Sequence, residues 1–588
     1  MCIACELHFP NLQDWRTGAG RTAFRRGPTG ATSPFAAIEV SPQEQRNTID
    51  QADCVIRAGA IHAMDQAGRT YRAIALRNGK IVALGAESHD LDGLLKPNVR
   101  VIDDASLTLF PGFIDTHTHL IFAGRAADDV PVEKAKNEAE FVDLIRQRAA
   151  ATPKGQWIRT SAAWNESNLA EKRMPLAHVL DQATTEHPVL VKRGGHNDVL
   201  NTLGMQLAGL TRDTPTPKGG TIWRDETGAP TGWLSDAAIS IAENVFPKPT
   251  VEGQLAGLRK ASRDYAAHGL CTVKDAFVSH DEIALLQRAA VEGALAVRVR
   301  AMLGVAFAAE SAADVAAEID GWELPADAPE GILSFWGLKF VIDGGAENSA
   351  TDQPYANRPD FNGQLMWAAD ALVAAVTQAA RRGLRVGIHA WGDRAVRTVL
   401  DVYEKVLHDV GNVPMGNLVL EHGGLALPEQ RARAIKLGIP VTVQHPLLHE
   451  LAPLILENWG RARTEQIFPL REWLAEGALL AAGSDYPVGP YDAMRSISGM
   501  VTRQTRAGIL GPEHAIDVAT AIRLYTSDAA RLMQEEASLG SLEPGKRADI
   551  VAYPRDPMTV PAEELGELAP VFTLVGGRAM HDPTGRFE

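Results

Sequence analysis

Two histidines, His117 and His119, stand one residue apart at the end of an apolar segment, residues 113–119. Residues i and i+2 of an extended strand project to the same side, so both imidazoles can point the same way. Two neutral imidazoles on one side can bind zinc or a similar ion at two points. The pair alone is a weak signal, because surface histidines can have the same spacing.

Other polar side chains stand in the same position, at the ends of later apolar segments. Four histidines and an aspartate at the strand ends of one fold are hard to explain by packing alone. Together they predict a metal centre, since imidazole and carboxylate groups are common ligands of divalent ions. The later candidates are Lys339, His389, His422 and Asp485.

Eight apolar segments would have to position these side chains. Helical patterns separate most of them, and eight parallel strand–helix units describe a (β/α)8 TIM barrel of the α/β class. Such a barrel keeps its active site at the C-terminal ends of its strands, where the candidates fall. The predicted strands are residues 113–119, 271–276, 297–302, 338–342, 386–389, 418–421, 441–444 and 479–482.

The rest of the chain is assigned around this barrel, which takes residues 109–539. Residues 1–50 are rich in Gly, Pro, Arg and Thr and are predicted to be a poorly ordered extension. Short strand patterns at 51–108 and 540–588 predict a small β-sandwich built from both ends of the chain. The gap after the first barrel strand is too long for one crossover, so an inserted subdomain is predicted over about 130–245.

The motifs resemble a known family. The sequence Phe-Pro-Gly-Phe-Ile-Asp-Thr-His-Thr-His at 110–119 is very close to the opening motif of the amidohydrolase superfamily of metal-dependent hydrolases. The segments around Lys339, His389, His422 and Asp485 fit that family in the same order. The insertion and the Gly-Leu-Lys-x-x-x-Asp-Gly stretch at 337–344 resemble the amidohydrolase-3 (YtcJ-like) branch, which includes N-substituted formamide deformylase. The resemblance begins near residue 53 and makes the predicted sandwich urease-like.

The resemblance implies a set of ligands for one or two divalent ions. His117 and His119 would hold the more buried ion, and His389 and His422 would hold the second. Lys339 would be carboxylated and bridge both ions, because a free ammonium cannot coordinate a cation. The alternative is a charged lysine that replaces one ion and leaves a mononuclear site. Zinc is the expected metal, with manganese, cobalt or iron also compatible with these ligands.

The resemblance also implies a reaction. A metal-activated hydroxide would attack a carbonyl and cleave a non-peptide C–N bond of the amide or formamide type. Asp485 would contact the metal, accept a proton from the bound water and return it to the leaving nitrogen. The expected partner is therefore a small-molecule substrate.

Further candidates rest on weaker signals. His445, at the end of the seventh predicted strand, is a catalytic candidate because it could donate to the substrate carbonyl. Buried hydrogen-bonding or packing roles are alternatives for the candidates for substrate binding, which are His196, Asn197, Trp391 and Tyr486.

Other functions remain open to different degrees. Deaminases on the same barrel typically carry a shuttle glutamate three residues after the strand-five histidine, where this chain has Gly392. An esterase or lactonase stays possible, because the same hydroxide attacks either carbonyl. A non-catalytic barrel used as an interaction protein would be expected to have lost ligands, yet all six positions hold competent residues. The sequence has no Gly-x-Ser-x-Gly nucleophile elbow.

Composition excludes other classes of protein. The formal net charge of −15 argues against a general nucleic-acid binder, which needs a basic face. The sequence contains no run of about 18 apolar residues, which is the length that a membrane span requires. Four cysteines in 588 residues indicate a reducing compartment, so a cytoplasmic location is expected. The sequence leaves open whether the chain forms a homo-oligomer.

Overall fold

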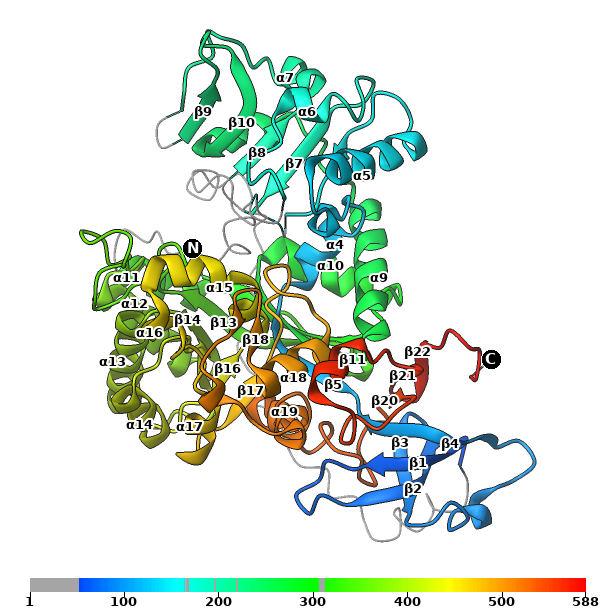
Figure 1. Cartoon of the computed structure of the whole chain (residues 1–588). Coiled ribbons are helices and arrows are strands. Elements are labelled where there is room, and N and C mark those ends of the chain that lie inside the picture. The colour runs from blue at the N-terminus through cyan, green and yellow to red at the C-terminus, as the bar shows by residue number, and fades with distance from the viewer. Residues whose placement is uncertain are drawn as a thin grey trace. The chain divides into compact units, whose positions relative to one another are not determined.

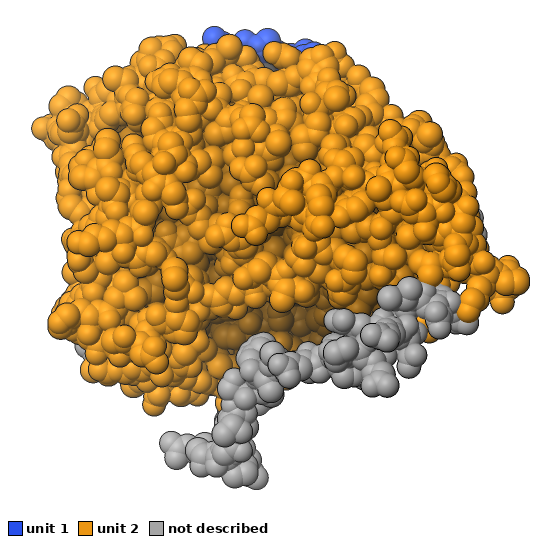
Figure 2. Space-filling model, turned by 90° about the horizontal axis from the view of Figure 1, so that it is seen from below, with its two compact units in different colours: residues 1–21, 121–260 blue, residues 22–120, 261–588 orange. Residues whose placement is uncertain are grey.

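A computed structural model describes residues 52–162, 164, 166, 169–194, 197–217, 220–305 and 312–587. Within this part of the chain, residues 121–260 form a smaller compact unit, and residues 52–120 and 261–587 form a larger one. Figure 2 colours the two units separately. The predicted N-terminal extension, residues 1–50, lies outside the described residues, as does His196.

The larger unit contains an eight-stranded parallel sheet. Its strands follow one another in sequence order, and all are buried or nearly so on both faces, as parallel strands covered by helices require. The sheet confirms the predicted barrel, and each of the eight predicted strands is present. The strands are β5 (Phe113–Thr118), β11 (Leu270–Val278), β12 (Arg298–Gly304), β13 (Leu333–Val341), β14 (Val386–Ala390), β15 (Leu418–His422), β16 (Val441–Val443) and β17 (Leu480–Ala482).

The first and last strands of this sheet are joined by specific hydrogen bonds. The Thr116 hydroxyl donates to the carbonyl oxygen of Ala482 at 2.9 Å. Just beyond β17, the backbone N–H of Asp485 donates to the carbonyl oxygen of His117 at 2.7 Å. These bonds bring the end of β17 beside the end of β5, so the candidate ligands of both strands meet.

Helices cover the outside of the barrel. Those that follow β12 to β15 lie side by side in sequence order (Figure 1). α13 buries Val396, Val399 and Tyr403 along one face, which is the apolar stripe expected of a covering helix. The helices of the larger unit, together with α9, whose residues up to Lys260 belong to the smaller unit, are α9 (Val251–Ala267), α10 (His280–Val291), α11 (Ala312–Gly321), α12 (Ala369–Arg381), α13 (Asp393–Val410), α14 (Pro428–Lys436), α15 (His445–Trp459), α16 (Arg461–Thr464), α17 (Leu470–Ala475), α18 (Ala493–Thr502), α19 (Val518–Leu524) and α20 (Ser527–Met533).

Both ends of the described chain share one seven-stranded sheet. β20 pairs antiparallel with β4, which places Val551 opposite Phe110. A two-residue turn, Asn78-Gly79, connects β2 to β3, and both residues have positive φ, as the predicted hairpin requires. The strand order is β22 (Arg578–His581), β21 (Phe572–Val575), β20 (Ile550–Tyr553), β4 (Arg100–Pro111), β1 (Cys54–His62), β2 (Thr70–Arg77) and β3 (Lys80–Gly85).

The smaller unit has its own sheet and its own hydrophobic core. Its described range, Ile121–Lys260, is wider at both ends than the 130–245 predicted for the insertion. Phe141, Val189 and Val199 are among its fully buried core residues. Its sheet order is β6 (Ile158–Arg159), β7 (Val189–Arg193), β8 (Asn197–Leu200), β10 (Pro230–Asp236) and β9 (Gly220–Arg224), and its helices include α5 (Glu138–Ala151) and α7 (Thr202–Leu207). Across the described residues of the whole chain, no helix is both long and apolar enough to cross a membrane.

Candidate metal centre

The structure brings the six predicted ligands together at the C-terminal ends of the barrel strands. Nε2 of His119 lies 3.0 Å from Oδ1 of Asp485, and Nε2 of His117 lies 3.6 Å from the same oxygen. Nζ of Lys339 is 3.5 Å from Nε2 of His117. The ring centre of His422 is 4.6 Å from that of His117 and 4.4 Å from that of His389. All six side chains are buried.

Three of these residues have ligand atoms close enough to share one ion. One nitrogen each of His117 and His422 and one oxygen of Asp485 all lie within 4.8 Å of one another. Two imidazoles and a carboxylate are a donor set that suits zinc and related divalent ions. The geometry therefore fits a metal centre at this end of the barrel.

Hydrogen bonds fix the tautomer of two of the imidazoles, those of His117 and His422, whereas both ring nitrogens of His119 face an oxygen. Nδ1 of His117 lies 2.6 Å from a carboxylate oxygen of Glu421, and Nδ1 of His119 lies 2.7 Å from the carbonyl oxygen of Ala276. Nδ1 of His422 lies 2.7 Å from Oε1 of Gln444. Each acceptor is an oxygen, so Nδ1 carries the proton and donates. Nε2 of His117 and of His422 then keeps its lone pair for a metal, which is the usual arrangement of histidine ligands.

Two ring nitrogens of the cluster have no hydrogen-bond partner among the described residues. Nε2 of His422 is buried and makes no hydrogen bond to any described residue. The same holds for Nε2 of His389, which lies 3.5 Å from Oδ1 of Asp343. Buried polar atoms without a partner are rare and call for an explanation such as a bound ion.

Burial also sets the protonation state of the cluster. It lowers the pKa of His117, His389 and His422 well below the usual value for histidine. The Lys339 ammonium acts in the same direction on His117 and His389. Neutral imidazole is the form that binds a metal, so these residues are ready to bind at neutral pH.

Two of the candidate ligands have an unusual backbone conformation. φ is +72° at His422 and +52° at Asp485, in the left-handed region that non-glycine residues seldom adopt. Such strained residues cluster at functional sites, where the surrounding structure holds them in place. His422 is the last residue of β15, and Asp485 lies three residues beyond the last residue of β17, where each side chain must turn toward the cluster.

Two buried aspartates hold the loops that carry the ligands. Asp115 accepts hydrogen bonds from the backbone N–H groups of His117 and Ser484, and burial raises its pKa to about 7. Asp343 accepts from the N–H groups of Trp391 and Gly392, and burial likewise raises its pKa to about 7. Both residues lie within the motifs described above, but only the structure shows that they hold these loops.

The sequence analysis missed a third buried group behind His117. Nζ of Lys274, on β11, lies 2.5 Å from Oε1 of Glu421, and neither side chain is exposed. Thr442 donates to Oε2 of the same carboxylate at 2.7 Å. The available signal was a lysine in the middle of a fully buried strand, because a charged residue there requires a partner.

His445, a catalytic candidate from a weaker sequence signal, has no contact with the cluster among those described above. His445 is the first residue of α15 and packs against α18, where a Cβ on Gly499 would lie 2.2 Å from Nδ1 of the ring. Burial lowers the pKa of His445 well below the usual value for histidine, and Arg503, which is not a member of the cluster, acts in the same direction. The catalytic role of His445 remains a prediction.

The aromatic and amide candidates differ among themselves. Trp391 contacts the cluster, with its ring centre 5.9 Å from that of His422. Tyr486 follows Asp485 and packs edge-on against Tyr491 at 4.9 Å. In the smaller unit, Oδ1 of Asn197 accepts hydrogen bonds from Trp233 and Ser235. Their roles in substrate binding remain predictions.

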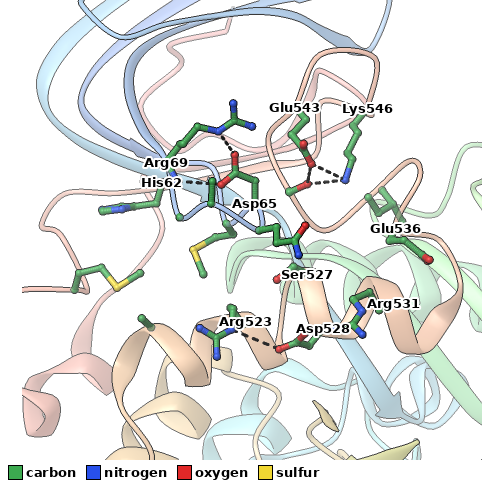
Figure 3. A pocket seen from close by; sticks show the side chains of 18 residues that line it. His62, Asp65, Arg69, Arg523, Ser527, Asp528, Arg531, Glu536, Glu543 and Lys546 are labelled. Atoms are coloured by element: carbon green, nitrogen blue, oxygen red, sulfur yellow. Dashed lines mark hydrogen bonds and ion pairs between the residues drawn. The ribbon is translucent and has the colours of Figure 1, made fainter. Parts of the chain in front are cut away.

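A separate pocket of about 920 Å³ lies in the larger unit, and none of the predicted site residues lines it (Figure 3). Asp65 pairs with Arg69 on one side, and Glu543 pairs with Lys546 nearby. On the other side, Asp528 pairs with Arg523. Because these charges neutralise one another, the pocket presents no set of converging groups comparable to the histidine cluster.

A parallel barrel that gathers four imidazoles, a carboxylate and a lysine at the ends of its strands defines the class of metal-dependent barrel hydrolases. The model of the amidohydrolase family matches residues 100–581, and the chain belongs to this family. It is therefore a hydrolase of the amidohydrolase class.

Two relatives agree with this assignment, and a solved structure agrees with the fold. The chain is 28% identical to N-substituted formamide deformylase from Arthrobacter pascens, over 91% of this chain and 99% of that protein. It is 26% identical to the putative amidohydrolase YtcJ from Bacillus subtilis, over 89% and 98%. Its fold is similar to that of an uncharacterized metal-dependent hydrolase from Pyrococcus horikoshii, with a TM-score of 0.69, 23% identity and coverage of 87% and 99%.

Proposed function

We propose that this enzyme hydrolyses a non-peptide C–N bond of the amide or formamide type at a divalent metal centre, with Asp485 as general base and acid. The convergence of His117, His119, His422 and Asp485 at the barrel end carries the proposal. The similarity to a protein named N-substituted formamide deformylase supports the substrate class.

The residues divide the chemistry between them. A bound divalent ion would supply acidification of water and polarisation of the substrate carbonyl. Asp485 is held beside His119 at 3.0 Å, where its carboxylate can accept a proton from water and return it to the departing nitrogen. His117, His119, His389 and His422 would hold the metal.

Lys339 has two proposed states. Its Nζ lies 3.5 Å from Nε2 of His117, so a charged ammonium there would compete with a metal for the same lone pair. A carboxylated Lys339 would instead offer oxygen ligands and bridge two ions. Zinc is the proposed metal. Metal analysis with and without added bicarbonate distinguishes two ions per chain from one.

A deaminase is disfavoured by one further observation. The deaminase shuttle glutamate would fall at Gly392, where a Cβ would lie 2.0 Å from the carbonyl oxygen of Ala350. No side chain fits at this position without moving the backbone. Hydrolysis of an amide is therefore favoured over deamination, and an ester or lactone substrate remains the second candidate.

The test is a panel of N-formyl, N-acyl and ester substrates on metal-loaded enzyme, with His389→Ala as a control that lacks a proposed ligand. We expect N-formyl or N-acyl compounds to be hydrolysed by the wild-type enzyme and not by the control. A protein purified without chelator that holds no divalent metal, and gains no activity from zinc or manganese, would contradict the proposal.

The remaining proposals concern the rest of the molecule. His445 is proposed to contact the substrate carbonyl, and His196, Asn197, Trp391 and Tyr486 are proposed to contact the substrate. The enzyme is proposed to act in the cytoplasm on a small molecule. The inserted subdomain, 130–245, and a β-sandwich from 51–108 and 540–588 complete the proposed domain organisation.

A further inference from the structure

A fully buried ion pair lies behind the candidate metal centre. Lys274 comes from β11 and Glu421 from β15, and their Nζ and Oε1 atoms are 2.5 Å apart with neither side chain exposed. Taking two charges out of water is costly, and apolar residues of similar volume often serve stability as well or better. The pair therefore calls for a role other than stability.

The second oxygen of Glu421 points to that role. Oε2 accepts hydrogen bonds from Nδ1 of His117 at 2.6 Å and from the Thr442 hydroxyl at 2.7 Å. Both carboxylate oxygens are thus occupied, and the carboxylate cannot rotate without losing a contact. The opposite edge of the His117 ring, which carries Nε2, lies 3.5 Å from Lys339 and 3.6 Å from Asp485.

The barrel interior is shaped to hold this pair. Nζ of Lys274 lies 4.4 Å from the centre of the Trp336 ring, so its charge also meets an aromatic face. On the neighbouring strand β14, residue 387 is glycine, and a Cβ there would lie 2.5 Å from Oε1 of Glu421. Lys274 is therefore confined between Glu421 and Trp336, at a position from which it holds the carboxylate.

We propose that Lys274, Glu421 and Thr442 are positioning residues of the metal centre, which hold the His117 ring with its proton on Nδ1 and its Nε2 directed to the ion. This inference rests on the proposed function, because it takes His117 as a ligand. Lys274 keeps Glu421 turned toward Nδ1, and the carboxylate increases the donor strength of Nε2. Groups of this kind commonly change metal affinity by 10- to 100-fold.

The test compares Glu421→Gln and Lys274→Met with a matched control. The control is Arg298→Met, which breaks another buried pair, between Arg298 and Asp549 (2.8 Å), in the same unit. Zinc affinity is measured by competition with a chelator, and the visible spectrum of the cobalt-loaded protein reports the coordination geometry. We expect both variants to bind zinc about 10- to 100-fold more weakly with an altered cobalt spectrum, and the control to match wild type.

Folding of each variant is checked by circular dichroism. A folded Glu421→Gln or Lys274→Met protein with wild-type zinc affinity and cobalt spectrum would overturn the inference, as would an equal loss in Arg298→Met. Should Lys274→Met fail to fold, Thr442→Val provides the decision, because it removes the hydrogen bond to Glu421, together with those that the Thr442 hydroxyl accepts from Gln444 and from the His422 N–H. Thr442→Ser, which keeps the hydroxyl, is its control. Unchanged zinc binding in Thr442→Val would also overturn the inference. A wild-type protein that binds no metal would instead contradict the proposed function itself.

Discussion

Asp485 contacts both His117 and His119, the first with its backbone and the second with its side chain. Its backbone N–H is bonded to the carbonyl of His117, while its side chain reaches Nε2 of His119. The left-handed φ of +52° is what allows backbone and side chain to face the same strand end. This placement suits a group that must both contact a metal and move a proton.

Replacing Asp485 with asparagine should separate these two tasks. Asparagine keeps an oxygen for the site but accepts no proton, so we expect kcat to fall by about 100- to 10,000-fold. Metal content, measured by elemental analysis, should stay largely intact. Asp517→Asn is the control, because Asp517 caps α19 and asparagine is an equally good cap. Near-normal turnover by the Asp485 variant would rule out its role as the base.

The sequence located the candidate ligands better than it located the groups that support them. His117, His119 and the later candidates stand at strand ends, where a barrel concentrates function, so a one-dimensional pattern was sufficient. Lys274 and Glu421 lie 147 residues apart, and their contact depends on two strands that are not neighbours in the sheet. No local spacing encodes such a contact. Asp343 and Asp115 were likewise in view as motif residues, but their hydrogen bonds to loop N–H groups depend on the folded loops.

At the scale of elements, β14 must leave room for the side chain of Glu421. Gly387 provides this room, because a Cβ at that position would lie 2.5 Å from Oε1 of Glu421. The same Cβ would lie 2.7 Å from Cε of Met302. The glycine two residues before His389 thus leaves space for Glu421 beside the candidate metal centre.

Gly387→Ala should therefore disturb the centre without removing any ligand. Overpacking of this kind typically costs about 1–3 kcal/mol of stability. We expect weaker zinc binding in chelator competition and a lower midpoint of thermal unfolding. Gly321→Ala is the matched control, because nothing lies within 4 Å of a Cβ at that position. Equal behaviour of the two variants would show that the contact with Glu421 is unimportant.

The strands were predictable because parallel barrel strands are buried on both faces and read as short apolar runs. Their limits were less so. β13 begins at Leu333, five residues before the predicted start, because Ser334 and Gly337 interrupt the apolar pattern. β16 ends at Val443, since Gln444 and His445 begin the turn into α15.

In the smaller unit, the carboxylate of Asp129 makes the stability of the folded state depend on pH. Asp129 lies 2.7 Å from Nε of Arg159 on β6. Burial raises the pKa of Asp129 to about 6, and Arg159 only partly offsets this effect. The folded state therefore binds a proton more tightly than the unfolded chain between about pH 4 and pH 6.

It follows that the contribution of Asp129 to stability is greatest below about pH 4 and is lost as the pH rises through about 6. Asp129→Asn should remove this dependence, which amounts to up to about 3 kcal/mol at about 1.4 kcal/mol per pKa unit. Urea unfolding at several pH values measures it. Asp143→Asn, at an exposed position of α5, serves as the control. A variant with the pH dependence of wild type would contradict the assignment.

At the scale of the whole molecule, the sheet made from both ends of the chain depends on its last strands. β20 covers one edge of β4, and Ile550 and Phe572 share a core with Leu109. The two segments could be recognised from sequence as strand-forming, but only the register of β20 against β4 shows that neither end has a complete core alone.

A chain that ends at residue 547 should therefore expose this core. We expect it to aggregate, or to elute in the void volume on size-exclusion chromatography, because an unpaired strand edge and buried apolar residues become accessible. A chain that ends at residue 582 keeps β20 to β22 and should behave as the full-length protein. A soluble, metal-binding protein that ends at residue 547 would show that the shared sheet is dispensable.

The hydrogen bonds that close the barrel also bear on the order of folding. Thr116 and Ala482 are 366 residues apart, and contacts of such separation form late, because loop-closure entropy opposes them until the intervening strands are in place. His117 and His119 leave the ribosome long before Asp485 does. A nascent or half-folded chain thus carries these imidazoles without Asp485 beside them, so the cluster is complete only when the last strand closes the ring.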